Sequence, residues 1–158
     1  MRKRALLSFV LLLTSIILAL LVDLFTLKYR SGHSVSGNGN PGVLFVIFGF
    51  VCLITLIITT SQLTKTYYQN HPDQRSNKIL SCIFIVLFAL MAAGEILKIN
   101  VLRETLNGFT NHETSIVYRF GWINQYTNHL FYNIYVIGMG ITISFFLGRL
   151  LLSRGYRF

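Results

Sequence analysis

The stretch "ILSCIFIVLFALMAAGEILKI", residues 79–99, decides the fold of this chain, because its first charged side chain is Glu95. A helix rises about 1.5 Å per residue, so a run of this length crosses the hydrocarbon layer of a bilayer, which is about 30 Å thick. Apolar and polar residues do not alternate along the run, as they would in a strand of a membrane barrel. The stretch therefore predicts a transmembrane helix with an acidic side chain near one end.

Three further runs have the same character, and they cover residues 5–27, 43–63 and 130–152. The chain is 53% hydrophobic and only 12% charged, whereas a soluble domain has about 25% charged residues. We therefore predict an all-α integral membrane protein, a four-helix bundle that forms one domain over residues 1–158. The basic "MRKR" precedes an apolar run that is too long for a secretory signal, so we expect an uncleaved anchor.

The distribution of lysine and arginine predicts the orientation. Four spans place both termini on one side, and nine basic residues fall there: Arg2, Lys3, Arg4, Lys65, Arg75, Lys78, Arg149, Arg154 and Arg157. The other side has five, which are Lys28, Arg30, Lys98, Arg103 and Arg119. Cytoplasmic loops carry the excess of basic residues, so both termini are expected to be cytoplasmic.

The net charge of +9 favours contact with the anionic headgroups of a lipid bilayer. The basic residues lie in short segments next to the spans, so no nucleic-acid partner is expected. We expect a plasma-membrane protein, and the small size and the lack of glycosylation sequons fit a bacterial cell.

A short extracytoplasmic segment is expected between the third and fourth spans. Apolar residues keep a helical spacing as far as Leu106, so the third helix is expected to end near Asn107 and Gly108. The segment that follows is rich in aromatic residues, namely Tyr118, Phe120, Trp122 and Tyr126. Such residues are enriched at the membrane interface, so we predict an amphipathic segment that lies in the headgroup layer.

Small residues predict where the helices pack. The fourth span has Gly140, Ser144 and Gly148 at intervals of four, and the third has Ala89 and Ala93. This spacing lets two backbones approach closely. We predict that these two faces contact each other, or that one of them forms the seam of a homo-oligomer or of a complex with a membrane-protein partner.

Polar residues from three spans are expected to converge at the outer rim. They are Asp23, Glu95, Lys98, His129 and Asn133. Ionisable groups in spans are costly and mark proton or ion pathways. The rival interpretation is structural: Glu95 can pair with Lys98 one turn away, and Asp23 can pair with Lys28 or Arg30. We favour the structural interpretation.

Enzyme signatures are missing from the sequence. It has no H-E-x-x-H motif, no C-x-x-C motif and no triad arrangement around its serines. We therefore expect no catalytic residue, no metal and no cofactor, and the sequence favours a non-enzymatic protein over an enzyme.

Three functions remain open. The first, which we favour, is a small multi-pass plasma-membrane protein that acts by packing against a membrane partner or itself. The second is a proton- or ion-coupled transporter or channel component that uses Asp23, Glu95 and His129. The third is an outer-face ligand-binding protein or membrane enzyme.

Overall fold

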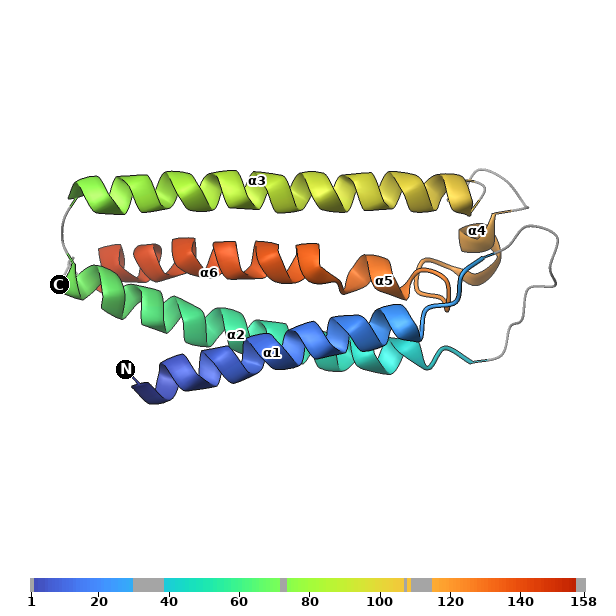
Figure 1. The fold of residues 1–158 in the computed structure, drawn as a ribbon, viewed down its shortest axis with the longest axis horizontal. Coiled ribbons are helices and arrows are strands. Elements are labelled where there is room, and N and C mark those ends of the chain that lie inside the picture. The colour runs from blue at the N-terminus through green and yellow to red at the C-terminus, as the bar shows by residue number, and fades with distance from the viewer. Residues whose placement is uncertain (1, 30–38, 72–73, 107, 109–114, 156–158) are drawn as a thin grey trace.

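The computed structural model describes residues 2–29, 39–71, 74–106, 108 and 115–155. Its long helices are α1 (Arg2–Leu24), α2 (Gly42–Asn70), α3 (Gln74–Thr105) and α6 (Ile134–Gly155). Two short helices, α4 (Ile116–Phe120) and α5 (Asn128–Phe131), lie between α3 and α6 in the chain. Figure 1 shows the four long helices side by side, with the start of α1 and the last turns of α6 at one end. We call the opposite end, where α4 and α5 lie, the cap end.

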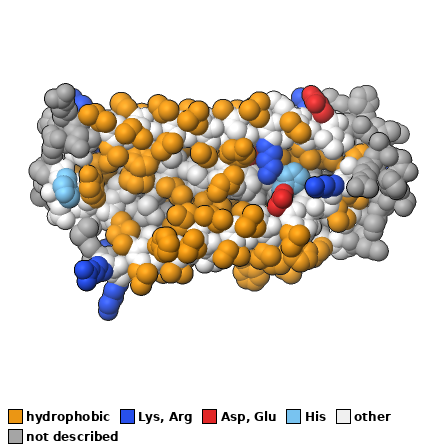
Figure 2. All heavy atoms as spheres, viewed as in Figure 1, with side chains coloured by type: hydrophobic (Ala, Val, Ile, Leu, Met, Phe, Trp, Pro, Cys, Tyr) orange, Lys and Arg blue, Asp and Glu red, His pale blue; other side chains and the backbone are white. Residues whose placement is uncertain are grey.

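The fold is the predicted all-helical one, and the described residues contain no strand. Four helical stretches are long and apolar enough to cross a membrane: Arg2–Leu24, Gly42–Asn70, Asn77–Thr105 and Asn128–Leu152. Apolar side chains cover most of the face seen in Figure 2. A bilayer can cover this surface, because lipid chains are as apolar as leucine.

The helices pack in a chain of neighbours. α1 packs on α2, α2 packs on α6, and α6 packs on α3. Within the described residues, α3 makes no comparable contact with α1 or α2, although its cap-end half also touches α5. One side of the bundle, between α1 and α3, is therefore open.

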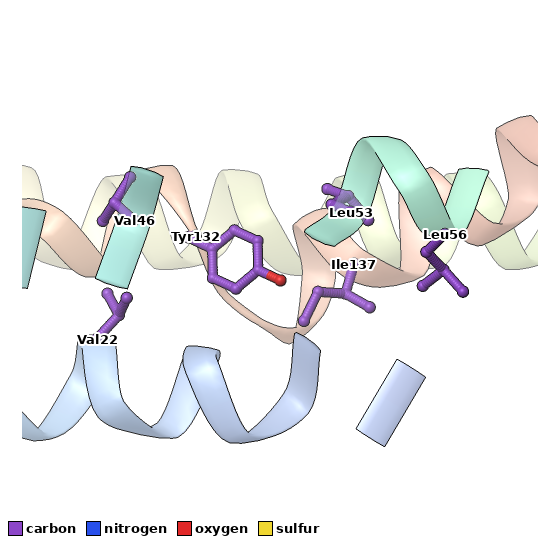
Figure 3. Packing of buried hydrophobic residues seen from close by; sticks show 6 residues of the cluster. All are labelled: Val22, Val46, Leu53, Leu56, Tyr132 and Ile137. Carbon is purple, nitrogen blue, oxygen red and sulfur yellow. The ribbon is translucent and has the colours of Figure 1, made fainter. Parts of the chain in front are cut away.

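The largest core cluster surrounds Tyr132, whose side chain is fully buried. Figure 3 shows its ring among apolar side chains of α1, α2 and α6, which are Val22, Val46, Leu53, Leu56 and Ile137. Gly49 makes room for the ring, because a Cβ atom there would lie 2.7 Å from it. Polar side chains also join α1 to α2, since Ser8 donates to Thr59 and Ser15 donates to Cys52.

The fourth span departs from the expected uninterrupted helix over residues 130–152. α5 ends at Phe131, Tyr132 is extended (φ −142°, ψ 109°), and α6 begins at Ile134. The extended backbone directs the Tyr132 ring into the core between α1 and α2. The sequence did not reveal this interruption because Tyr132 and its apolar neighbours are also compatible with a continuous helix.

The small residues of α6 pack against α2, which corrects the expected contact with α3. A Cβ atom on Gly140 would meet Leu53 and Ile57, and one on Gly148 would meet Ser61 and Thr64. Ser144, between them, is fully buried. Ala89 and Ala93 are exposed on α3, so a seam with another chain at these two residues stays a prediction.

Residues 115–127, which we call the cap, close the cap end of the bundle. Ile116, Val117 and Tyr126 form a second apolar cluster with Leu106. Tyr118, Phe120 and Trp122 are exposed, as an interfacial segment requires, but Tyr126 is buried. Tyr126 therefore faces the interior of the protein, where its ring packs edge-on against Tyr29, and not the lipid headgroups.

The packing of α6 on α2 predicts a sharp cost for a larger side chain at Gly148. A Cβ atom there would lie 2.7 Å from the Ser61 carbonyl oxygen, which belongs to the backbone and cannot turn aside. We expect Gly148→Val to lower the free energy of unfolding by about 1–3 kcal/mol, the usual cost of overpacking. Ala93→Val is the matched control on exposed α3. Detergent-solubilised protein unfolded by heat or SDS would report both, and an equal loss from the two variants would contradict this packing.

Candidate functional site

The interruption of the fourth span leaves a backbone carbonyl, that of His129, without its helical partner. Two side chains replace that partner: Lys98 Nζ donates to the His129 carbonyl at 2.9 Å, and Asn133 Nδ2 donates to it at 3.0 Å. A carbonyl with no donor would be costly in lipid, where no water replaces the lost bond. Lys98 therefore connects α3 to the interrupted backbone.

Asn133 holds the start of α6 and also binds α3. Its side-chain oxygen accepts hydrogen bonds from the backbone N–H groups of Tyr135 at 2.8 Å and Val136 at 3.2 Å. This is the bonding of a helix N-cap. Its amide nitrogen donates to Glu95 Oε2 at 2.8 Å. One asparagine thus satisfies two donors at the helix start and fixes the helix to α3.

These bonds account for the glutamate in the third span. Glu95 is only 8% exposed and accepts the hydrogen bond of Asn133. The hydrogen bonds that the structure shows for the Glu95 and Lys98 side chains run to the fourth span rather than to each other. Lys98 still lies close enough to interact electrostatically with the carboxylates of Glu95 and Asp23.

The five polar residues expected at the rim lie together at the cap end. Besides the bonds of Glu95, Lys98 and Asn133, His129 interacts electrostatically with Lys98 and Asp23. The Nδ1 atom of His129 is buried and has no hydrogen-bond partner. Figure 2 shows acidic, basic and histidine side chains gathered on one face, between the apolar side chains of α1 and those of α3. Of the partners expected for Asp23, Arg30 lies outside the described residues.

The depth of this cluster follows from helix lengths. Asp23 lies about 29 Å along α1 from the basic Arg4, and Lys98 lies about 30 Å along α3 from the basic Lys78. The hydrocarbon layer is about 30 Å thick. With Arg4 and Lys78 at one boundary, both charged groups reach the other boundary. Glu95 and Asn133 then lie just inside the hydrocarbon layer.

A cavity of about 330 Å³ opens beside the cluster. It lies between the end of α1 with the residues after it and the end of α3. Its acidic, basic and imidazole side chains are those of Asp23, Lys28 and His129. Its other walls come from Thr26, Leu27, Tyr29, Leu102, Thr105, Leu106 and Tyr126.

Two contacts that the sequence did not predict join the helices and loops around the cavity. Asn40 and Asn128 exchange hydrogen bonds between their side-chain amides, which joins the start of α2 to α5. The backbone N–H of Leu27 donates to the Gln125 carbonyl at 2.8 Å, which joins the end of α1 to the cap. The sequence signal for Asn128 was its position beside His129. Its partner, 88 positions away, had no local signal.

The described residues contain no group of three or more histidine, cysteine, aspartate or glutamate residues placed to hold a metal ion. The rim offers a ligand hydrogen-bond donors and acceptors and side chains of both charges. We compared the chain with protein-family models, curated proteins and solved structures, and none of them matches it.

Substitutions of Glu95 test whether it acts as a hydrogen-bond acceptor. Glu95→Gln keeps an acceptor oxygen for Asn133, so we expect only a small change in the free energy of unfolding. Glu95→Leu removes it and leaves a buried amide N–H unpaired, which costs about 1–3 kcal/mol. Thermal unfolding in detergent measures both. If Glu95→Gln were as destabilising as Glu95→Leu, the negative charge and not the hydrogen bond would hold α3 to the fourth span.

Proposed function

We propose that this chain is a non-enzymatic multi-pass membrane protein that binds an amphipathic ligand at its cap end. The observation that carries the proposal is the cavity between α1 and α3, whose lining combines the polar Asp23, Lys28 and His129 with leucines. Ligand sites are concave and mostly apolar, with a few convergent polar groups that orient the ligand. This cavity has both kinds of wall.

The supporting walls are built from fixed elements. Lys98, Asn133 and Glu95 lock α3 to α6, and the Asn40–Asn128 pair locks α2 to α5. Because these bonds lie next to the cavity, the site is formed before a ligand arrives. Preformed sites lose less conformational entropy on binding.

We also propose how the chain is oriented and in which membrane it lies. The excess of basic residues beside both termini supports cytoplasmic termini, and the cap end would then face outward from a plasma membrane. The ligand then arrives from the outer leaflet or from outside the cell. Packing against a partner or a second copy through Ala89 and Ala93 is compatible with this site, because α3 presents them away from α6.

A blocked cavity tests the proposal. Thr105 lines the cavity near the end of α3, whereas Val101, one turn earlier, is exposed and does not line it. We expect native mass spectrometry of the chain, extracted gently from its membrane, to show a bound small molecule. Thr105→Trp should lose that adduct because its indole fills the cavity, and Val101→Trp should keep it.

Two results would contradict the proposal. One is that the wild-type chain carries no adduct, or that Thr105→Trp carries as much of it as the wild-type chain. The other is a pH-dependent ion flux in liposomes that Asp23→Asn abolishes while the fold is retained. The second result would favour the transporter or channel component instead.

A further inference from the structure

We propose that the ligand is a phospholipid whose headgroup carries both a phosphate and a primary ammonium, as in phosphatidylethanolamine. This inference rests on the proposed function, since it names the ligand of the same cavity. It follows from four features of the site: the balance of its charges, its donors and acceptors, its depth and its opening toward lipid.

The charges of the site are balanced. Asp23 and Lys28 line the cavity with opposite charges, and the adjoining Lys98 and Glu95 add one further charge of each sign. The group therefore has no net formal charge when His129 is neutral. A purely anionic headgroup would gain from Lys28 but would be repelled by Asp23, whereas a zwitterion satisfies both.

The distribution of donors and acceptors also selects the headgroup. The carboxylate of Asp23 is an acceptor for an ammonium N–H. Lys28 is a donor for phosphate oxygens, and it is exposed at the cavity wall. A trimethylated ammonium, as in phosphatidylcholine, has no N–H to donate to Asp23. The site should therefore distinguish the two headgroups.

The depth and the opening of the cavity fit a lipid rather than a soluble molecule. Asp23 lies at the boundary of the hydrocarbon layer, about 29 Å along α1 from Arg4, which is where a headgroup sits. Below the cavity α1 and α3 do not pack on each other, and Figure 2 shows apolar side chains along both. The acyl chains can run down this open side while the headgroup occupies the cavity.

Native mass spectrometry of the full chain in detergent tests the inference by titration with three lipids of identical acyl chains. Phosphatidylethanolamine should bind about tenfold more tightly than phosphatidylcholine or phosphatidylglycerol, the effect of one hydrogen bond to a charged group. Asp23→Asn should remove the preference over phosphatidylcholine, while Glu104→Gln, an exposed carboxylate outside the cavity, should keep it. Lys28→Gln should weaken the binding of all three lipids, and Arg103→Gln should leave their binding unchanged.

A second measurement leaves the protein unchanged. Successive N-methylation of the ethanolamine lipid removes its N–H donors one by one, so the affinity of the wild-type chain should fall with each methyl group. Soluble phosphoethanolamine, added at the concentration of the lipid, should not displace it because the apolar walls would stay unfilled. Displacement at that concentration would show that the ligand is a soluble molecule and would overturn the assignment to a lipid.

The outcomes separate this inference from the function on which it rests. Suppose that Thr105→Trp removes the adduct, but the three lipids bind with equal affinity or Asp23→Asn leaves the preference unchanged. The lipid assignment is then overturned, and the cavity remains a ligand site. Lipid adducts that persist in Thr105→Trp overturn both, because the lipids would then bind elsewhere on the apolar surface.

Discussion

A backbone carbonyl that loses its helical partner near the edge of the hydrocarbon layer must find another donor, because lipid offers none. In this protein that carbonyl belongs to His129, and its donors come from Lys98 and Asn133. Lys98 must therefore stand on α3 at the level of the interruption, and Glu95 beside it accepts the remaining amide hydrogen of Asn133. The charged residues of the third span therefore bind the polar groups that the interruption of the fourth span exposes. Glu95 therefore stands in an apolar run because it binds the asparagine that starts the helix of the fourth span.

The interruption also shapes the core and the cavity. It directs Tyr132 between α1 and α2, where Gly49 leaves room for the ring, and it frees α5 to bond with the start of α2 through Asn128. α6 then packs its glycines against α2 and leaves α3 attached mainly through one face. Because α3 does not close onto α1, the rim residues border a cavity rather than a sealed core. The same geometry that satisfies the backbone thus creates a concave region in which Asp23, Lys28 and His129 lie beside apolar side chains.

The number of spans and the helical class could be predicted from sequence because both follow from the length and composition of apolar runs, which need no knowledge of partners. The level of Asp23, Glu95 and His129 could be predicted for the same reason, since it follows from counting residues along helices. The interruption at Tyr132 could not, because its neighbours suit a continuous helix and its stabilising bonds come from α3. The sequence also could not predict which helix packs against the small residues of α6. Gly140 and Gly148 suit any close partner, and only the three-dimensional packing selects α2 over α3. The burial of Tyr126 could not be predicted because aromatic residues suit both an interface and a small apolar core.

Backbone carbon chemical shifts of residues 128–137, measured by NMR on the chain in lipid nanodiscs, test the central claim most directly. The account predicts helical shifts at residues 128–131, an extended value at Tyr132 and helical values again from Ile134 onward. It further predicts that Lys98→Met, which removes one donor to the His129 carbonyl, shifts the His129 carbonyl resonance more than that of any other residue in the fourth span. Unbroken helical shifts from residue 128 to residue 137, with no response to Lys98→Met, would contradict it.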